Sequence, residues 1–176
     1  MVRVSWGRSG QTPQDATFAR AAGQGKLGEF AASGGQYSVT AVGLDSAGVA
    51  RFAHIGTSLT VSGKGTGGDP VALTLRPKPA DVVVTWRMAN GSGCPSGVIL
   101  PYFISLYRTP ATDGGTLSQK VTETQESCSS RSATLKSVAP GSYVVDLDSR
   151  AVTPKVKATK PVTVLPGENA TVDFQL

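Results

Sequence analysis

The feature that most constrains the fold of this chain is a set of short sequence blocks that occurs twice in the same order. A valine-rich stretch ends in tryptophan in VRVSW, at Trp6, and again in VVVTW, at Trp86. A glycine followed two residues later by tyrosine comes next, in GGQYSV at Tyr37 and in PGSYVV at Tyr143. Matches that recur in one order indicate an internal repeat. Trp6 precedes Tyr37 by 31 residues and Trp86 precedes Tyr143 by 57, so the second copy carries 26 more.

A third block closes each copy, over 59–75 in the first and 162–176 in the second. A length of 176 residues suits two small domains of roughly 80–100 residues, each with its own core. Between them lies RPKPA, 76–80, whose two prolines favour an extended linker. We therefore predict domains at 1–77 and 78–176, the second with an insertion. The chain starts on the opening strand of the first copy and stops on the closing strand of the second. We therefore also expect this chain to be a segment of a longer protein.

The composition predicts β-structure, because 21 glycines and 11 prolines interrupt the chain frequently. Apolar residues alternate with polar ones in YSVTAV, 37–42, and in TVDFQL, 171–176, which is typical of strands with one buried face. Turn sequences such as TGGD, NGSG and LPGEN separate these strands, at the spacing of an antiparallel sandwich or barrel. Only 12–23 has helix signals, with Pro13 at its start and Gly23 at its end, and this stretch is left open.

The second copy contains LKSVAPGSYVVDL, followed about twenty residues later by VTVLPGENATVDFQL. This pair resembles the C-terminal half of prealbumin-like, or carboxypeptidase-regulatory-like, β-sandwich modules, a group that includes the collagen-adhesin B-type repeats. The first copy departs from the pattern, because Gly34 stands where the motif has proline. The match is carried by Leu135, Pro140, Gly141, Tyr143, Val145, Val162, Val164, Gly167, Val172, Phe174 and Leu176.

The resemblance implies an all-β fold of two tandem antiparallel Greek-key β-sandwich domains, immunoglobulin-like or prealbumin-like. It also implies an accessory or scaffold role in surface or secreted bacterial proteins, and it carries over no catalytic residue. The aromatic residues of the matched blocks are expected to form the structural core of the two sandwiches, namely Trp6, Tyr37, Trp86, Tyr143 and Phe174.

Two cysteines, Cys94 and Cys128, both lie between Trp86 and Tyr143, and the first copy has none. An antibody-type domain needs a cysteine before its core tryptophan, so that pattern fails. A disulfide between them would close a loop of 34 residues and contribute roughly 3–4 kcal/mol in the chain-entropy model. We predict this disulfide, and with it an extracytoplasmic location that is secreted, periplasmic or cell-surface. The alternative is a pair of unpaired thiols in a reducing cytoplasm.

Catalytic residues are scarce in the sequence. The one histidine, His54, would need Asp45 or Ser46 as a partner, and the repeat alignment sets it opposite Lys157, on an exposed face. Asp146 and Asp148 share one face of a strand, where two solvated carboxylates are the simpler interpretation. The glycine-rich GTGGDP, 65–70, lacks the ending of a phosphate-binding loop. We therefore predict no enzyme, no cofactor and no metal site.

The net charge is +5, and its densest basic cluster is KVKATK. Lysines along an exposed edge strand keep other chains from pairing with it. The alternative is a binding surface for an acidic polysaccharide or a partner protein, formed by Lys155, Lys157 and Lys160. No aromatic residues interleave with these lysines, which argues against nucleic acid. Asn90 and Asn169 match the glycosylation pattern, whose use depends on the host.

Two functions remain open at this point. The first is a non-catalytic structural or interaction segment that spaces or docks parts of a larger protein, binding its other domains or a surface partner. The alternative is a carbohydrate-binding module, which needs exposed aromatic residues. The candidate strand is PYFISLY, where Tyr102, Ile104 and Leu106 alternate with Phe103, Ser105 and Tyr107. We expect most of these aromatics in the core, because only 6% of the residues are aromatic.

Overall fold

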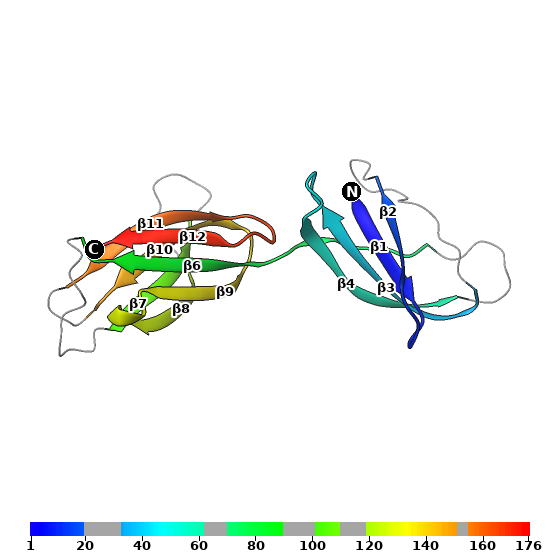
Figure 1. Cartoon of the computed structure of the whole chain (residues 1–176), viewed down its shortest axis with the longest axis horizontal. Coiled ribbons are helices and arrows are strands. Elements are labelled where there is room, and N and C mark those ends of the chain that lie inside the picture. Colours follow the sequence, from blue (N-terminus) through cyan, green and yellow to red (C-terminus); the bar gives the residue numbers. More distant parts are fainter. Residues whose placement is uncertain (20–32, 62–69, 90–100, 110–118, 151–154) are drawn as a thin grey trace. The chain divides into compact units, whose positions relative to one another are not determined.

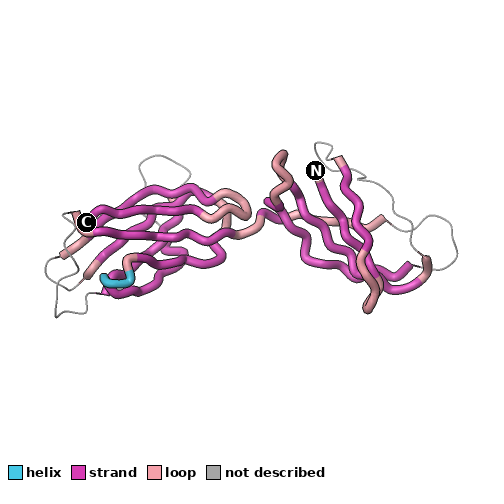
Figure 2. The backbone as a smooth tube through the Cα atoms, viewed as in Figure 1, coloured by secondary structure: helices cyan, strands magenta, loops and turns pink. Residues whose placement is uncertain are grey.

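The computed structural model describes residues 1–19, 33–61, 70–89, 101–109, 119–150 and 155–176 (Figure 1). Most described residues lie in β-strands (Figure 2). The chain divides into two compact units, Met1–Lys78 and Pro79–Leu176. Among the described residues, no helix is long and apolar enough to cross a bilayer.

The first unit contains one antiparallel sheet with the strand order β2-β1-β3-β4-β5. The stretch with helix signals forms a strand at its centre, where Gln14–Phe18 pairs with Val2–Gly7. Part of the expected linker also joins the sheet, since Arg76 and Pro77 pair with Ala53 and Phe52. The strands are β1 (Val2–Gly7), β2 (Gln14–Phe18), β3 (Gly35–Leu44), β4 (Ala50–Val61) and β5 (Arg76–Pro77).

One face of this sheet is apolar because side chains alternate along each strand. The buried residues of that face come from β1 and β3, and Leu73 and Leu75 pack on them from the segment before β5. The described residues of the unit thus form one sheet, and they do not confirm a sandwich over 1–77. The buried set is Val2, Val4, Trp6, Tyr37, Val39 and Ala41.

The second unit contains two sheets, with the orders β11-β10-β7-β8 and β12-β6-β9. All strand pairs are antiparallel except β6 with β12, which run parallel with Trp86 opposite Phe174. A 3-10 turn, η1 (Cys128–Ser130), follows β8. The strands are β6 (Ala80–Arg87), β7 (Pro101–Arg108), β8 (Gln119–Ser127), β9 (Ser132–Val138), β10 (Gly141–Asp148), β11 (Lys157–Val164) and β12 (Ala170–Gln175).

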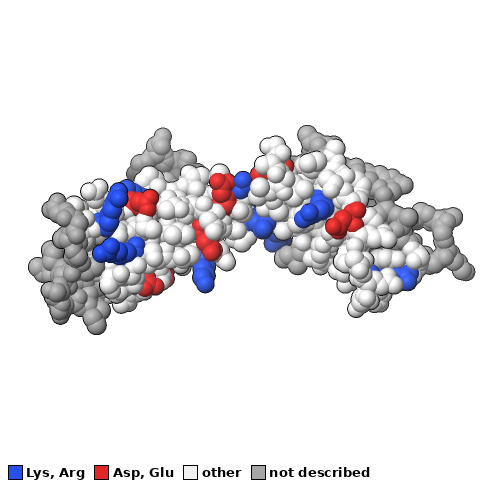
Figure 3. All heavy atoms as spheres, in the orientation of Figure 1, with Lys and Arg blue, Asp and Glu red and all other residues white. Residues whose placement is uncertain are grey.

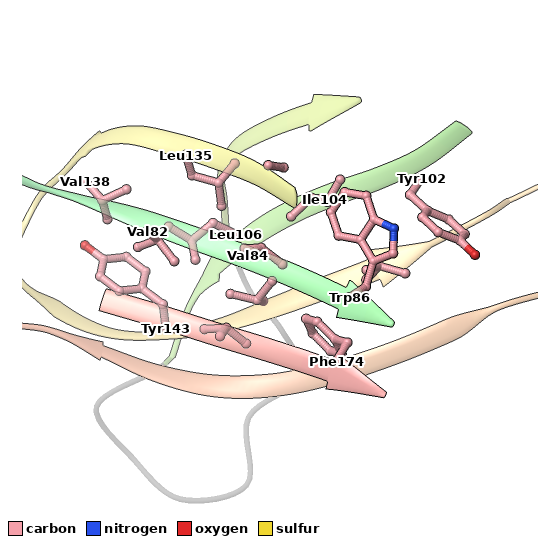
Figure 4. Packing of buried hydrophobic residues seen from close by; sticks show 14 of the residues in the cluster. Val82, Val84, Trp86, Tyr102, Ile104, Leu106, Leu135, Val138, Tyr143 and Phe174 are labelled. Atoms are coloured by element: carbon pink, nitrogen blue, oxygen red, sulfur yellow. The ribbon is translucent and has the colours of Figure 1, made fainter. Parts of the chain in front are cut away.

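The two sheets of this unit enclose one hydrophobic core, to which every strand except β8 contributes buried residues (Figure 4). The Trp86 indole meets the Tyr102 ring edge to face, with ring centroids 5.6 Å apart. Its Nε1–H donates to the Cys128 carbonyl at 3.0 Å, so the one polar atom of the indole is satisfied. The indole thereby ties β6, of one sheet, to β7, of the other.

Both units share a tyrosine that ties its strand to the preceding turn. The Tyr37 hydroxyl donates to the Ser33 carbonyl at 2.9 Å, and the Tyr143 hydroxyl donates to the Ala139 carbonyl at 2.7 Å. Each bond reaches back four residues, across the glycine of the repeated motif. The following hairpins also match, because Tyr37 pairs with Leu59 and Tyr143 pairs with Val162.

The tryptophan strands do not match in this way. In the first unit β1 is a direct neighbour of β3, with Trp6 opposite Val39. In the second unit β6 lies in the sheet that faces β10, so Trp86 and Tyr143 belong to opposite layers. Trp6 is 7% and Trp86 is 3% exposed, so both are buried, but they occupy non-equivalent places in their units. The sequence repeat therefore describes the tyrosine hairpins better than the opening strands.

Replacing Tyr143 by phenylalanine should lower the free energy of unfolding of the second unit by roughly 1–2 kcal/mol, because the Ala139 carbonyl loses its donor while the ring stays packed. Urea unfolding measured by tryptophan fluorescence tests this. Tyr107→Phe is the matched control, since its ring lies on the outer side of β7. Equal stabilities for the two variants would contradict a structural role for the Tyr143 hydroxyl.

Candidate functional site

The outer face of the sheet β11-β10-β7-β8 carries four of the polar residues that the sequence analysis named, namely Ser105, Asp146, Asp148 and Lys157. Alternation along β7 sends Tyr102, Ile104 and Leu106 into the core, each 0% exposed. Phe103 and Tyr107 lie on the outer face, where each is half-buried. Most aromatic residues of this strand were expected in the core. Only Tyr102 lies there, and the expectation is wrong for Phe103 and Tyr107. Tyrosine, with an apolar ring and a polar hydroxyl, is a residue type enriched at protein interfaces.

A polar row crosses three strands of this face. Ser105 on β7 lies opposite Asp146 on β10 and opposite Glu123 on β8. The Ser105 hydroxyl donates to Glu123 Oε2 at 2.7 Å, which leaves it unavailable to Asp146. Asp146 is only 8% exposed, and its Oδ1 is buried without a hydrogen-bond partner.

Arg150 covers this row from the end of β10. Its guanidinium lies 3.8 Å from the Phe103 ring centroid and forms an ion pair with Glu123. Its backbone N–H donates to Asp148 Oδ1 at 2.6 Å, and its φ of 48° is a left-handed conformation that residues other than glycine rarely adopt. The local turn at Asp148 thus aims the guanidinium back over the sheet.

The two carboxylates of the row, the half-buried Glu123 and the buried Asp146, have pKa shifts of opposite sign. The hydrogen bond from Ser105 lowers the pKa of Glu123, and Lys120 and Arg150 act in the same direction. Desolvation raises the pKa of Asp146; Asp148 adds to this, while Lys157 and Arg150 oppose it. Asp146 and Asp148 were interpreted as two solvated carboxylates, and for Asp146 this is wrong, because its neighbours on the sheet bury it.

The three lysines proposed as a binding surface do not share one face. Lys157 pairs with Asp148 on the outer face of β11, whereas Lys160 pairs with Val145, whose side chain enters the core. The Lys160 ammonium donates to the Asp173 carbonyl at 2.5 Å and lies 5.8 Å from the Phe174 ring centroid. It therefore links β11 to β12, between the two sheets. Lys155 is exposed and lies before β11.

Charge on the described surface is mixed in sign. On the face drawn in Figure 3, basic and acidic side chains form small separate groups on each unit. β11 is an edge strand of its sheet, which fits the protective role of lysines there. No group of three His, Cys, Asp or Glu side chains among the described residues is arranged to hold a metal ion.

His54 is half-buried, and the expectation of an exposed face is wrong. A β-bulge in β4 shifts the register, so His54 lies opposite Ala41 on the core side of the sheet. Its Nε2 is 2.7 Å from the Thr57 hydroxyl, and its Nδ1 accepts from the Thr74 backbone N–H at 3.1 Å. Asp45 instead binds Arg51 at 2.8 Å and two backbone N–H groups of its own turn. The structure does not bring His54 and Asp45 together as partners.

The predicted disulfide and sequons are only partly within the described residues. Cys128 is 2% exposed and belongs to the core of the second unit. Cys94 and Asn90 lie outside the described residues, so the Cys94–Cys128 bridge stays a prediction. Asn169 is described, and its Oδ1 accepts the backbone N–H of Asp81 at 2.9 Å. That bond fixes the start of β6 beside the start of β12.

Comparisons with known proteins give only weak likenesses. No protein-family model matches the chain. No curated protein matches it. Among solved structures, the chain is similar to a "putative cell adhesion protein" of Bacteroides fragilis, with 13% sequence identity and a TM-score of 0.33. The match covers 99% of this chain and 79% of the other. A TM-score this low assigns neither fold nor function, so the function is argued from the residues themselves.

Asp146→Asn should raise the stability of the second unit at pH 7. A carboxyl with a raised folded-state pKa binds its proton more tightly in the folded state, so stability falls as pH rises through the unfolded and then the folded pKa. Above both values the buried charge is a penalty, and asparagine removes it. The gain should shrink toward zero below about pH 3.5, near the ordinary aspartate pKa.

Glu123→Gln is the matched comparison, with the opposite sign. A lowered folded-state pKa contributes stability that is present above the unfolded pKa and lost as pH falls through the folded one. This variant should therefore be less stable than the parent at pH 7, and the loss should disappear in acid. Urea unfolding of all three proteins between pH 3 and 7 measures both effects. If the stability differences of the two variants from the parent changed with pH in the same direction, the opposite pKa shifts of Asp146 and Glu123 would be refuted.

Proposed function

We propose that this chain is a non-catalytic structural or interaction segment of a larger extracytoplasmic bacterial protein. Its two β-units act as spacers or docking modules within that protein. The observation that carries the proposal is the environment of His54, the one histidine of the sequence. One ring nitrogen contacts a threonine hydroxyl and the other contacts main-chain atoms, so the imidazole acts as a brace between β4 and the segment at Thr74. In a hydrolytic triad a carboxylate orients the histidine, but here Asp45, the candidate carboxylate, binds Arg51, and the Nδ1 of His54 contacts main-chain atoms of Thr74.

The carboxylates also support a non-catalytic role. Asp45 holds its own turn and Arg51, Asp81 accepts the Ser137 backbone N–H at 2.9 Å, and Glu123 binds Ser105, Lys120 and Arg150. These groups connect loops and strands to each other. Such bonds favour rigid units whose outer surfaces are available for contact.

The outer face of β11-β10-β7-β8 is the surface we assign to docking in the second unit. Phe103, Arg150 and Glu123 hold one another in place, so little conformational freedom is lost when a partner covers them. On the same face, Lys157 lies on β11 opposite Asp148, and Tyr107 lies on β7 four residues after Phe103. Lys160 is excluded from the surface, because its ammonium is committed to Asp173.

The purified chain should show no turnover on ester, peptide or glycoside substrates above the level of its His54→Ala variant. Sensitive fluorogenic substrates of the three classes, measured from pH 5 to 9, test this. Thr57→Ala is assayed in parallel, because it removes the hydroxyl 2.7 Å from His54 Nε2, the candidate nucleophile for this base. Hydrolysis that either variant abolishes would show that the protein is an enzyme.

The extracytoplasmic assignment rests on the predicted bond between Cys94 and Cys128. Intact-mass analysis of the unreduced protein, after alkylation under denaturing conditions, should show no alkylated thiol. Reduction should then expose both thiols and lower the stability of the second unit, by roughly 2–5 kcal/mol for a native disulfide of a small domain. Two alkylatable thiols in oxidised material would remove the main support for this location.

A further inference from the structure

The first unit contains a hollow of about 260 Å³ beside the hairpin that joins β1 to β2. The half-buried Arg8 lines it, and the exposed residues around Arg8 are all polar. Trp6 and Tyr37 also line it, but they are only 7% and 9% exposed, so the polar residues provide the accessible surface. We refer to this hollow as the Arg8 pocket. Its exposed lining residues are Gln11, Thr12, Gln14 and Ser33.

Neutral oxygen atoms hold Arg8 in position. Its Nε donates to the Tyr37 hydroxyl at 3.2 Å, and its Nη2 donates to Ser33 Oγ at 2.8 Å and to the Ser33 and Gly34 carbonyls. These acceptors orient the guanidinium, but none of them has a negative charge. Arg8 forms no ion pair with the described residues, and no carboxylate is among those that line the pocket. A half-buried positive charge therefore has no counter-charge from the described part of the chain.

The Nη1 amino group of Arg8 is available to a ligand. The hydrogen bonds of Arg8 to the described residues use only Nε and Nη2, so both N–H groups of Nη1 lack an acceptor there. An anion at Nη1 would accept a charge-assisted hydrogen bond, which is roughly twice as strong as a neutral one. Because the rest of the guanidinium is already held, little side-chain entropy is lost on binding.

The glycine of the repeated motif makes room for this cation. A Cβ atom on Gly35 would lie 2.9 Å from Arg8 Nε, so a larger residue there would displace the guanidinium. At the equivalent Gly141 of the second unit, the three atoms nearest to such a Cβ all belong to Tyr143. Both hairpins have the tyrosine hydrogen bond to the preceding turn. The cation is therefore a feature that the first unit adds to a shared motif.

The phenol beside Arg8 indicates that its surroundings favour negative charge. The hydrogen bond with the Ser33 hydroxyl lowers the pKa of Tyr37, and Arg8 acts in the same direction, against desolvation, which raises it. A lowered pKa of a phenol means that its anionic form is stabilised relative to the neutral form.

The rim around Arg8 is neutral and rich in hydrogen-bonding groups. Gln11 and Gln14 each have an amide that both donates and accepts, and Thr12 has a hydroxyl group. Asp15, the acidic residue next to Gln14 on β2, lies on the other face of the sheet because side chains alternate along a strand. One positive charge among neutral donors and acceptors matches a ligand that has one negative charge and several hydroxyl groups.

We propose that the Arg8 pocket binds the charged group of an acidic sugar in a surface glycan, either a carboxylate or a sulfate ester. Each of these groups has one negative charge, which matches the single guanidinium, and the hydroxyl groups of the sugar match the rim. A protein carboxylate fits less well, because the core of a protein interface buries apolar and aromatic side chains, whereas the exposed lining here is polar.

This inference rests on the proposed interaction role and specifies what the first unit recognises. It places anion recognition in the first unit, whereas the sequence pointed to the lysines of 155–160 in the second.

The test uses the whole chain, with methyl glucuronide and glucose 6-sulfate as acidic probes and methyl glucoside as the neutral probe. In NMR titrations at constant ionic strength, the side-chain Nε–H signal of Arg8 should shift and reach saturation with at least one acidic probe. The neutral probe should bind at least tenfold more weakly, because it cannot accept the charge-assisted hydrogen bond as an anion does. Arg8→Gln, which lacks this signal, assigns it.

Gln14→Glu should weaken the binding of the acidic probe about threefold to tenfold, and Gln14→Lys should strengthen it by a similar factor, because each adds one charge beside the pocket. Gln14 is exposed, so neither change disturbs the core, which the NMR spectrum verifies. Gln125→Glu and Gln125→Lys, at an exposed position on β8 of the second unit, are the matched controls. They change the net charge equally and should bind like the parent.

The inference is wrong if neither acidic probe shifts the Arg8 signal, if the neutral probe binds as tightly, or if the two Gln14 variants bind alike. N-acetylglycine provides a peptide carboxylate of the same charge. If it binds more tightly than both acidic sugars, the pocket recognises protein and the glycan proposal is overturned. All of these results leave the non-catalytic role untouched, because that role is tested by turnover.

Discussion

The hydrogen bond from a tyrosine hydroxyl to the carbonyl four residues earlier determines much of both units. In the second unit it fixes the turn at 139–141 against the start of β10, and the register of β10 follows from that start. This register decides that Tyr143, Val145 and Leu147 face the core, and that Asp146 faces outward next to Ser105. A one-residue shift would exchange those faces and bury charged groups. The polar row of the outer face therefore depends on the register of β10, to which the Tyr143 hydrogen bond contributes near the start of the strand.

The same constraint operates in the first unit with different neighbours. Tyr37 binds the Ser33 carbonyl, but its hydroxyl also receives the Nε–H of Arg8, a residue that follows β1. The tyrosine therefore connects the β3 hairpin to the end of β1, and the polar end of the sheet face forms around this connection. In the second unit β6 lies in the other sheet, so no equivalent connection can form.

Sequence reasoning was reliable where the determinants are local. The aligned blocks set Leu59 and Val162 at corresponding points of the two copies, and the structure pairs these residues with Tyr37 and Tyr143 in corresponding hairpins. The position of His54 could not be predicted in this way, because a bulge in β4 moves it to the other side of the strand. Alternation also separated Phe103 from Tyr102, but it does not tell which set faces the core. That choice depends on the opposite sheet, where Trp86 packs against Tyr102.

The parallel pairing of β6 with β12 has a mechanical consequence. These are the first and last strands of the second unit, and they lie side by side from Val82 opposite Ala170 to Arg87 opposite Gln175. A tension that pulls the start of β6 and the end of β12 apart acts along both strands. It loads the whole ladder of hydrogen bonds in shear, so the bonds must break together, whereas a force across the strands would open them one at a time. The parallel pairing therefore makes the unit more resistant to a force applied at its two ends than to one applied across its strands.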